Sequence, residues 1–168
     1  MSLHLFDKDR EGMVLRIERS SIHDGSGFRT VVFLKGCPMR CQWCSTPESQ
    51  SFVEETAKDG TVYGTRMTVE QVVREVRKDS LFYFISAGGL TLSGGEILAQ
   101  PEFSLALLKN AKMECFRTAV ETSFIAPWEK IQPMLPYIDT AYVDLKVFDP
   151  KRHKEYCGIS NERILKNL

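Results

Sequence analysis

Apolar residues along this chain follow two repeats, one typical of buried strands and one typical of helices. The strand-like runs are rich in β-branched residues and cover residues 30–34, 90–92, 115–120 and 141–145. A short run at residues 13–17 predicts one more strand ahead of them. Residues 18–28 and 45–64 are polar and lack apolar periodicity, so they are expected to form mostly loops.

The helix-like repeat begins at Thr68. Its hydroxyl can cap the following helix while Gln71 reaches back, and four valines then share one face. Pro101 suits the first turn of a second helix, whose apolar face runs to Ala111. Residues 127–135, 149–156 and 161–168 predict three shorter helical segments.

Strands that alternate with helices predict an α/β fold with a parallel sheet and right-handed crossovers. In such sheets the chemistry gathers at the carboxyl ends of the strands. The candidate functional residues repeatedly follow predicted strands: three cysteines, then Gly94-Gly95-Glu96, then Glu121-Thr122, and finally Asp144 with Lys146.

Length and charge exclude several classes of protein. A chain of 168 residues can bury a core without disulfides, and its 22 basic residues balance 22 acidic ones, which gives no reason to expect nucleic acid or membrane binding. Five cysteines, three of them clustered, argue against a disulfide framework. The first residues are charged where a signal peptide would be apolar, so we expect a soluble cytoplasmic protein.

The stretch KGCPMRCQWC carries the strongest chemical signal. Cys37, Cys41 and Cys44 follow a predicted strand directly. A structural zinc site needs four protein ligands, whereas an iron-sulfur cubane held by three thiolates leaves one iron open for chemistry. The alternatives are a zinc site completed by a distant residue, or a group of buried thiols. The candidates for a fourth zinc ligand are His23, Cys115 and Cys157.

The triplet resembles the signature of the radical S-adenosylmethionine (SAM) enzymes, C-x3-C-x2-C with an aromatic residue, here Trp43, before the last cysteine. The stretch DGSGFRT, residues 24–30, resembles the lead-in of the glycyl radical enzyme activating enzymes. The resemblance implies a partial (βα) barrel, of which about four of the six strand-helix units are expected in this chain. Residues 1–168 are expected to form a single radical SAM domain. Because no cysteine lies between Cys44 and Cys115, we expect no inserted ferredoxin-like domain.

The resemblance also implies roles for individual residues, each with a plainer alternative. Gly94, Gly95 and Glu96 would hold the amino group of SAM, although a glycine pair after a strand is often only a turn. By the two-residue period of strands, Asp144 and Lys146 lie on one side of an extended segment, where they would face SAM or form a surface ion pair. The remaining roles are SAM or cation binding for Glu121, packing beside the cluster and adenine for Trp43, and contact with the partner for Asp24.

The implied reaction is reductive cleavage of SAM at a 4Fe-4S cluster on Cys37, Cys41 and Cys44, followed by hydrogen-atom abstraction from a glycine of a partner glycyl radical enzyme. A flavodoxin or ferredoxin would donate the electron. Two alternatives stay open: an activating protein of anaerobic ribonucleotide reductase, and a truncated, non-catalytic cluster-binding protein.

Overall fold

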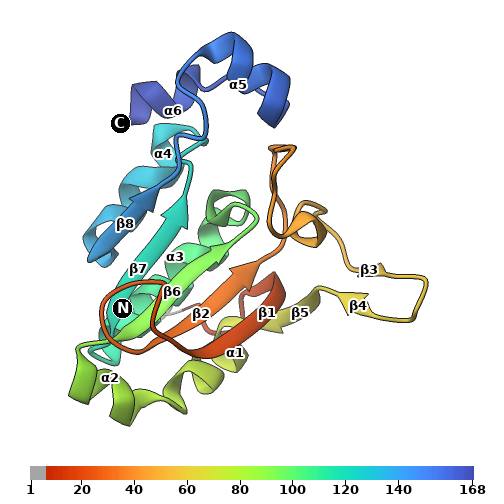
Figure 1. The fold of residues 1–168 in the computed structure, drawn as a ribbon. Helices are drawn as coiled ribbons and strands as arrows, with labels where there is room; N and C mark the ends of the chain where they lie inside the picture. Colours follow the sequence, from red (N-terminus) through yellow and green to blue (C-terminus); the bar gives the residue numbers. More distant parts are fainter. Residues whose placement is uncertain (1–6) are drawn as a thin grey trace.

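A six-stranded mixed sheet forms the centre of the computed structural model, which describes residues 7–168 (Figure 1). Its strand order is β5-β1-β2-β6-β7-β8. The four strands β2, β6, β7 and β8 are parallel, and β1 runs antiparallel to both β2 and β5. The strands are β1 (Glu11–Ser21), β2 (Arg29–Leu34), β5 (Thr65–Thr68), β6 (Gly89–Gly94), β7 (Arg117–Thr122) and β8 (Thr140–Val143).

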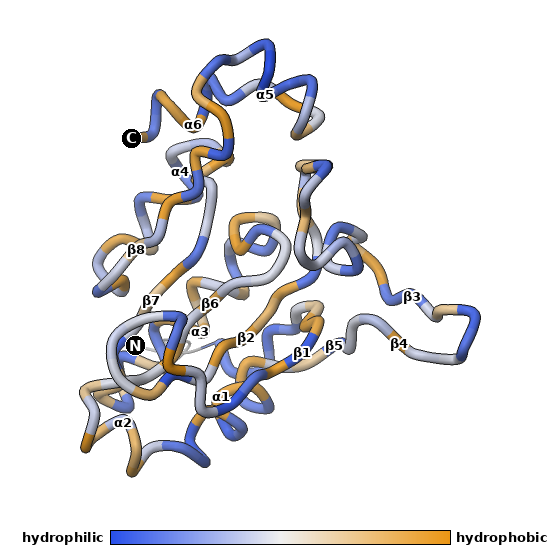
Figure 2. The backbone as a smooth tube through the Cα atoms, viewed as in Figure 1, coloured by the Kyte–Doolittle hydropathy of each residue, from blue (hydrophilic) through white to orange (hydrophobic). Residues whose placement is uncertain are grey.

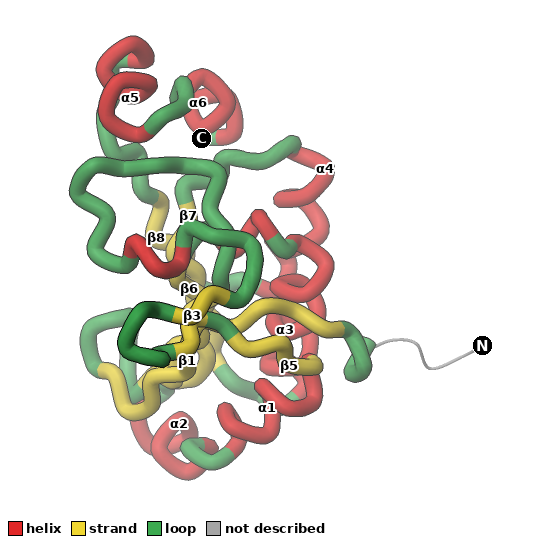
Figure 3. Tube along the Cα trace, turned by 90° about the vertical axis from the view of Figure 1, so that its right-hand side faces the viewer, coloured by secondary structure: helices red, strands yellow, loops and turns green. Residues whose placement is uncertain are grey.

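Helices cover one face of this sheet. Figure 3 shows α1, α3 and α4 along the same side of the strands, and Figure 1 places α5 and α6 beyond their carboxyl ends. The helices are α1 (Val69–Arg77), α2 (Ser80–Ser86), α3 (Pro101–Met113), α4 (Trp128–Ile131), α5 (Pro150–Cys157) and α6 (Glu162–Asn167). Short elements complete the fold: the 3-10 turns η1 (Pro47–Ser49), η2 (Ile97–Ala99) and η3 (Gln132–Tyr137), and a hairpin of β3 (Glu55–Thr56) and β4 (Val62–Tyr63).

The two-residue period of the parallel strands separates the core from the opposite face. In β6, Leu90 and Leu92 belong to the main apolar cluster with the helices, while Thr91 and Ser93 alternate with them and point to the other face. Glu121 occupies the same face of β7. Figure 2 shows the hydrophobic stretches along β2 and β7 in the middle of the molecule. One face of the sheet is therefore apolar and packed, and the other carries polar side chains.

The structure confirms the main elements predicted from the sequence. Thr68 and Gln71 form the predicted capping box at the start of α1, with both reciprocal hydrogen bonds present. The predicted strand-helix alternation gives four parallel strands, as expected. The predicted helices at residues 101–111, 149–156 and 161–168 correspond to α3, α5 and α6.

Several boundaries differ from the predictions, and the sheet is mixed rather than wholly parallel. β1 continues to Ser21, because pairing with β2 sustains an extended backbone where the sequence is polar. The third parallel strand begins at Arg117 rather than Cys115, since Cys115 has a positive φ of 60° in the turn after α3. The loop at residues 45–64 contains the β3-β4 hairpin, and α2 was not predicted because its apolar residues do not form one buried stripe.

No helix in residues 7–168 is long and apolar enough to cross a membrane. Residues 1–6 of the charged N-terminal stretch lie outside the described residues.

Candidate functional site

The cysteines lie on the loop of residues 36–45, here called the cysteine loop, which leaves the carboxyl end of β2. Cys37 is 6% exposed, Cys41 and Cys44 are half-buried, and all three are free thiols. Burial raises the pKa of Cys37 to about 11. Ahead of the loop, the buried Lys35 ammonium donates to the Glu48 carbonyl at 2.8 Å and to a Glu55 carboxylate oxygen at 2.7 Å.

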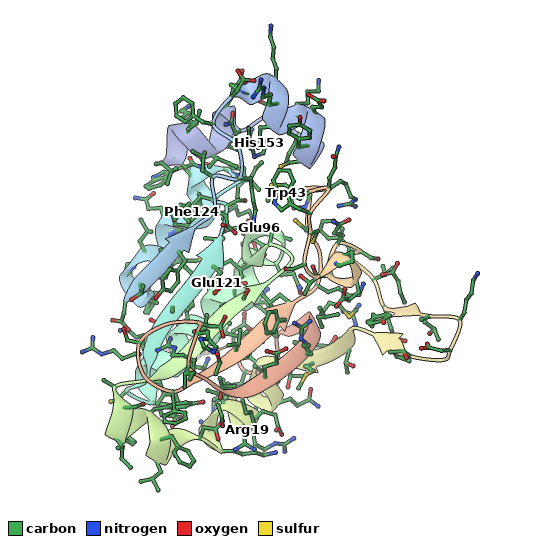
Figure 4. All side chains as sticks on the ribbon, in the orientation of Figure 1. Arg19, Trp43, Glu96, Glu121, Phe124 and His153 are labelled. Atoms are coloured by element: carbon green, nitrogen blue, oxygen red, sulfur yellow. The ribbon has the colours of Figure 1, made fainter. Side chains whose placement is uncertain are left out.

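A cavity of about 620 Å³ opens where the parallel strands end, and every residue predicted for the site lines it. Figure 4 shows Trp43 on the cysteine loop, with Glu96 and Glu121 on the neighbouring strand ends. The predicted residues in its lining are Asp24, Cys37, Cys41, Trp43, Cys44, Gly94, Gly95, Glu96, Glu121, Asp144 and Lys146. Five segments that are far apart in the sequence therefore meet at one site.

Sequence patterns did not point to several other lining residues. Arg16 and Phe33 enter from β1 and β2, and the Arg16 guanidinium lies 4.0 Å from the centre of the Phe33 ring. Ser93 enters from β6, and Ser123 follows β7. The alternation of polar and apolar residues in β6 was the only available signal for Ser93.

Glu96 is a buried acceptor that joins two strand ends. Its side chain is wholly protein-bound: one carboxylate oxygen accepts from the Leu98 amide at 3.1 Å and from the Thr122 hydroxyl, and the other accepts from the Ser123 amide at 2.9 Å and hydroxyl at 2.6 Å. With 2% exposure it holds the end of β6 against the end of β7. Both carboxylate oxygens are thus already engaged by groups of the chain.

The glycines before Glu96 allow two backbones to touch. A Cβ atom on Gly95 would lie 2.5 Å from the Gly36 carbonyl oxygen, and one on Gly94 would lie 2.3 Å from the Leu34 carbonyl oxygen. The Gly95 amide donates to the Leu34 carbonyl and the Glu96 amide to the Gly36 carbonyl, both at 2.9 Å. Glycine is required here because the neighbouring chain occupies the space that a side chain would need.

Negative charge in the cavity lining gathers around Glu121. Burial, with the charges of Asp24 and Asp144, raises the pKa of Glu121, although the Ser93 hydroxyl donates to its carboxylate at 2.5 Å. The Asp24 carboxylate accepts from the Ser21 hydroxyl, and the Asp24 carbonyl accepts from the Thr91 hydroxyl at 2.8 Å.

Asp144 and Lys146 form an ion pair of 2.6 Å, but not for the predicted reason. β8 ends at Val143, and Lys146 has a left-handed φ of 62°, so the segment is bent rather than extended. Burial opposes the charge of Lys146, yet its hydrogen bond to Asp144 leaves the pKa of Lys146 raised. The bend therefore brings the two side chains together at the cavity.

Trp43 is half-exposed on the cysteine loop. Its ring centre lies 6.1 Å from that of Tyr156 in α5. Arg29, in the same stretch as Asp24, has a structural role: its buried guanidinium donates to Thr91 and to the carbonyls of Leu90 and Arg117.

Three cysteine thiols on one loop provide the soft donor set that an iron-sulfur cubane takes from a protein. In residues 7–168, no three His, Cys, Asp or Glu side chains gather around one point that could hold an ion. His23 and Cys115 are exposed and absent from the cavity lining, and only Cys157 packs near the cysteine loop. In a cubane each thiolate binds a different iron, so three separated thiols on one loop suit that group.

Comparison with known proteins gives matches over most of the chain. The Radical SAM superfamily model matches residues 31–168. The isethionate sulfite-lyase activating enzyme of Nitratidesulfovibrio vulgaris is 38% identical, over 96% of this chain and 70% of that protein. The pyruvate formate-lyase 2-activating enzyme of Escherichia coli is 34% identical, over 96% of this chain and 62% of that protein.

The solved structure of QueE from Escherichia coli supports the fold, with a TM-score of 0.54, 16% identity, and coverage of 73% of this chain and 57% of that chain. The match to the isethionate relative runs over 214 positions, more than the 168 residues of this chain, so that relative holds residues in the matched region that this chain lacks. The extent and identity of these matches show that the chain belongs to the radical SAM superfamily and, within it, to the glycyl radical enzyme activating enzymes.

Proposed function

We propose that this activating enzyme binds a 4Fe-4S cluster through Cys37, Cys41 and Cys44, cleaves SAM reductively, and removes a hydrogen atom from a glycine of a partner glycyl radical enzyme. The observation that carries the proposal is the single cavity that joins the three thiols to the ends of β6, β7 and β8. By their names, the relatives reported above activate isethionate sulfite-lyase and pyruvate formate-lyase 2. We also propose a flavodoxin or ferredoxin as electron donor.

The cavity suits a ligand that carries both an ammonium and a carboxylate group. The thiols lie at one side, Glu121 and Asp144 provide negative charge, and Lys146 provides a positive charge. Three thiolates leave one iron of a cubane without a protein ligand, where the polar groups of SAM can bind. When bound, the cluster supplies the single electron, while the protein orients the ligand and excludes water.

The roles of the remaining residues follow from their places in the lining. We propose that the Gly94-Gly95-Glu96 backbone borders the amino end of SAM, while the Glu96 side chain fixes that backbone. Asp24 lies on the loop between β1 and β2, and we propose that it contacts the partner protein. Trp43, half-exposed beside the cysteines, is proposed to shield the cluster and the adenine.

We further propose that the sheet is part of a radical SAM partial (βα) barrel, in a single domain with no inserted ferredoxin-like domain. The order β2-β6-β7-β8 supports this proposal, because it supplies four neighbouring parallel strands. Within residues 7–168, β8 pairs only with β7, so its other edge is the place at which a barrel would continue.

Anaerobic reconstitution followed by electron paramagnetic resonance (EPR) tests the proposal. We expect about four irons per chain, a cubane signal after reduction that changes when SAM is added, and release of 5′-deoxyadenosine without any partner. Cys37→Ala, Cys41→Ala and Cys44→Ala should each lose the signal. Cys115→Ala, which removes an exposed thiol outside the cavity lining, is the matched control.

A cluster signal that ignores SAM, with no cleavage, would contradict the proposal and favour a non-catalytic cluster-binding protein. Transfer to the partner is tested separately, by the appearance of a glycyl radical signal when candidate glycyl radical enzymes are added. Asp24→Asn should weaken that transfer by a larger factor than it weakens SAM cleavage in the absence of partner.

A further inference from the structure

A fourth cysteine, Cys157, lies next to the cysteine loop although it is more than 100 residues away in the sequence. It is the last residue of α5 and is 0% exposed. Cys157, Cys37 and Met39 form a small apolar cluster of their own, against which Cys41 and Tyr156 pack. Figure 1 shows α5 close to the loop that follows β2. The thiol is therefore part of the wall behind the proposed cluster ligands.

Backbone hydrogen bonds fix the position of this wall relative to Cys41. The Arg40 amide donates to the Cys157 carbonyl at 2.8 Å, and the Gln42 amide donates to the Tyr156 carbonyl at 3.0 Å. These bonds come from the residues on either side of Cys41, so Cys41 is held directly against the last turn of α5. The Arg40 guanidinium also donates to the Cys37 carbonyl at 2.6 Å, so Arg40 links Cys37 as well to the last turn of α5.

The Cys157 thiol is suited to donate a hydrogen bond. A cysteine thiol is protonated at neutral pH because its ordinary pKa is about 8.5, and Cys157 is fully buried with Cys41 packed beside it. A buried S–H group is a weak donor that needs an acceptor. A sulfur that binds iron as a thiolate is an electron-rich acceptor.

We propose that Cys157 is a positioning residue, whose thiol donates a hydrogen bond to the Cys41 sulfur when that sulfur binds the cluster. Hydrogen bonds to ligating sulfurs favour the more negative, reduced cluster and so raise its reduction potential. Cys157 would thus make the cluster easier to reduce by a physiological donor. This inference rests on the proposed cluster at Cys37, Cys41 and Cys44.

Redox titration of the reconstituted chain, followed by EPR, tests the role of Cys157. Cys157→Ala removes the donor, and we expect the equilibrium constant for one-electron reduction to fall about tenfold, which is about 59 mV toward negative potential. Cys157→Ser keeps a donor and should stay close to the wild type. Cys115→Ala, with its exposed thiol, should not change the potential.

The outcomes separate this inference from the proposed function. A wild-type chain without a cubane signal overturns both. An intact cluster whose potential is the same in wild type and Cys157→Ala overturns the inference alone. Cys157→Val, which fills the space without a donor, replaces the alanine variant if that variant fails to fold. If neither variant takes up iron, pulsed EPR of the wild-type chain in D2O tests the inference. We expect a deuteron coupled to the cluster, with a coupling that changes in Cys157→Ser. A wild-type chain without such a deuteron coupling overturns the inference.

Discussion

Replacing Glu96 by glutamine changes one buried oxygen into an amide group that cannot accept a hydrogen bond. The two carboxylate oxygens accept from different backbone amides, one from Leu98 and the other from Ser123. Whichever way the glutamine amide turns, its NH2 group faces one of these N–H groups. The serine and threonine hydroxyls beside Glu96 can rotate to become acceptors, but a backbone amide cannot.

The expected cost follows from that one unsatisfied donor and from the loss of charge on the acceptor. A hydrogen bond to a charged group contributes about 1.5 to 3 kcal/mol, and a buried unpaired donor costs about 1 to 3 kcal/mol. Because these estimates describe the same contact, we expect Glu96→Gln to lower the free energy of unfolding by about 2 to 3 kcal/mol. For a chain of this length, that change lowers Tm by roughly 5 to 10 °C.

Urea unfolding at pH 7, with the midpoint and the slope compared between variants, measures this effect. Glu121→Gln is the matched control, because Glu121 lines the same cavity but accepts from the rotatable Ser93 hydroxyl. Its pKa is raised, so the folded state disfavours its charge, and the amide should leave the stability unchanged or slightly higher. Equal midpoints for Glu96→Gln and Glu121→Gln would refute the view that Glu96 holds the two strand ends together.

Three further predictions concern packing and pH. Gly95→Ala should destabilise the chain by about 1 to 3 kcal/mol and weaken SAM binding, since its Cβ would press on the Gly36 carbonyl; calorimetry and SAM titration measure the two effects. Asp79→Asn should destabilise the chain at neutral pH, because the Arg19 guanidinium lowers the pKa of that buried carboxylate. The difference in stability between wild type and Asp79→Asn should shrink as pH falls from the ordinary pKa of 3.8 through the lowered pKa of Asp79. Urea midpoints measured at a series of pH values check this. The pKa of Glu121 is raised, so its effect on stability runs in the opposite direction with pH. Wild type should lose stability relative to Glu121→Gln as pH rises above the ordinary pKa of 4.5.

The place of the site could be predicted from the sequence because it depends on topology. The cysteines, the Gly94-Gly95-Glu96 stretch and Glu121 each follow an apolar run, and the carboxyl ends of parallel strands meet at one edge of a sheet. That rule brings them into one cavity without knowledge of any side-chain contact. Asp144 and Lys146 also reach it, although the backbone there bends in a way that no two-residue period describes.

Contacts between distant residues could not be predicted in the same way. The Glu96 carboxylate accepts hydrogen bonds from Thr122 and Ser123, and Cys157 packs against the cysteine loop. Both contacts join distant parts of the chain, so neither leaves a pattern within a short stretch of sequence. Nothing in the local sequence marks Thr122 and Ser123, at the end of a strand, or Cys157, at the end of a helix, as partners of distant residues. Only the folded chain shows which of these groups meet.

The cysteine loop is held by protein contacts on three sides, and this arrangement bears on how the site works. Lys35 anchors its start, the Gly95 backbone packs against Gly36, and the last turn of α5 accepts hydrogen bonds from residues on either side of Cys41. None of these contacts uses a cysteine sulfur. The backbone that carries the three cysteines is therefore fixed by the chain itself, which would lower the ordering cost of binding the proposed cluster. The same contacts leave the cavity side of the loop free for the ligand.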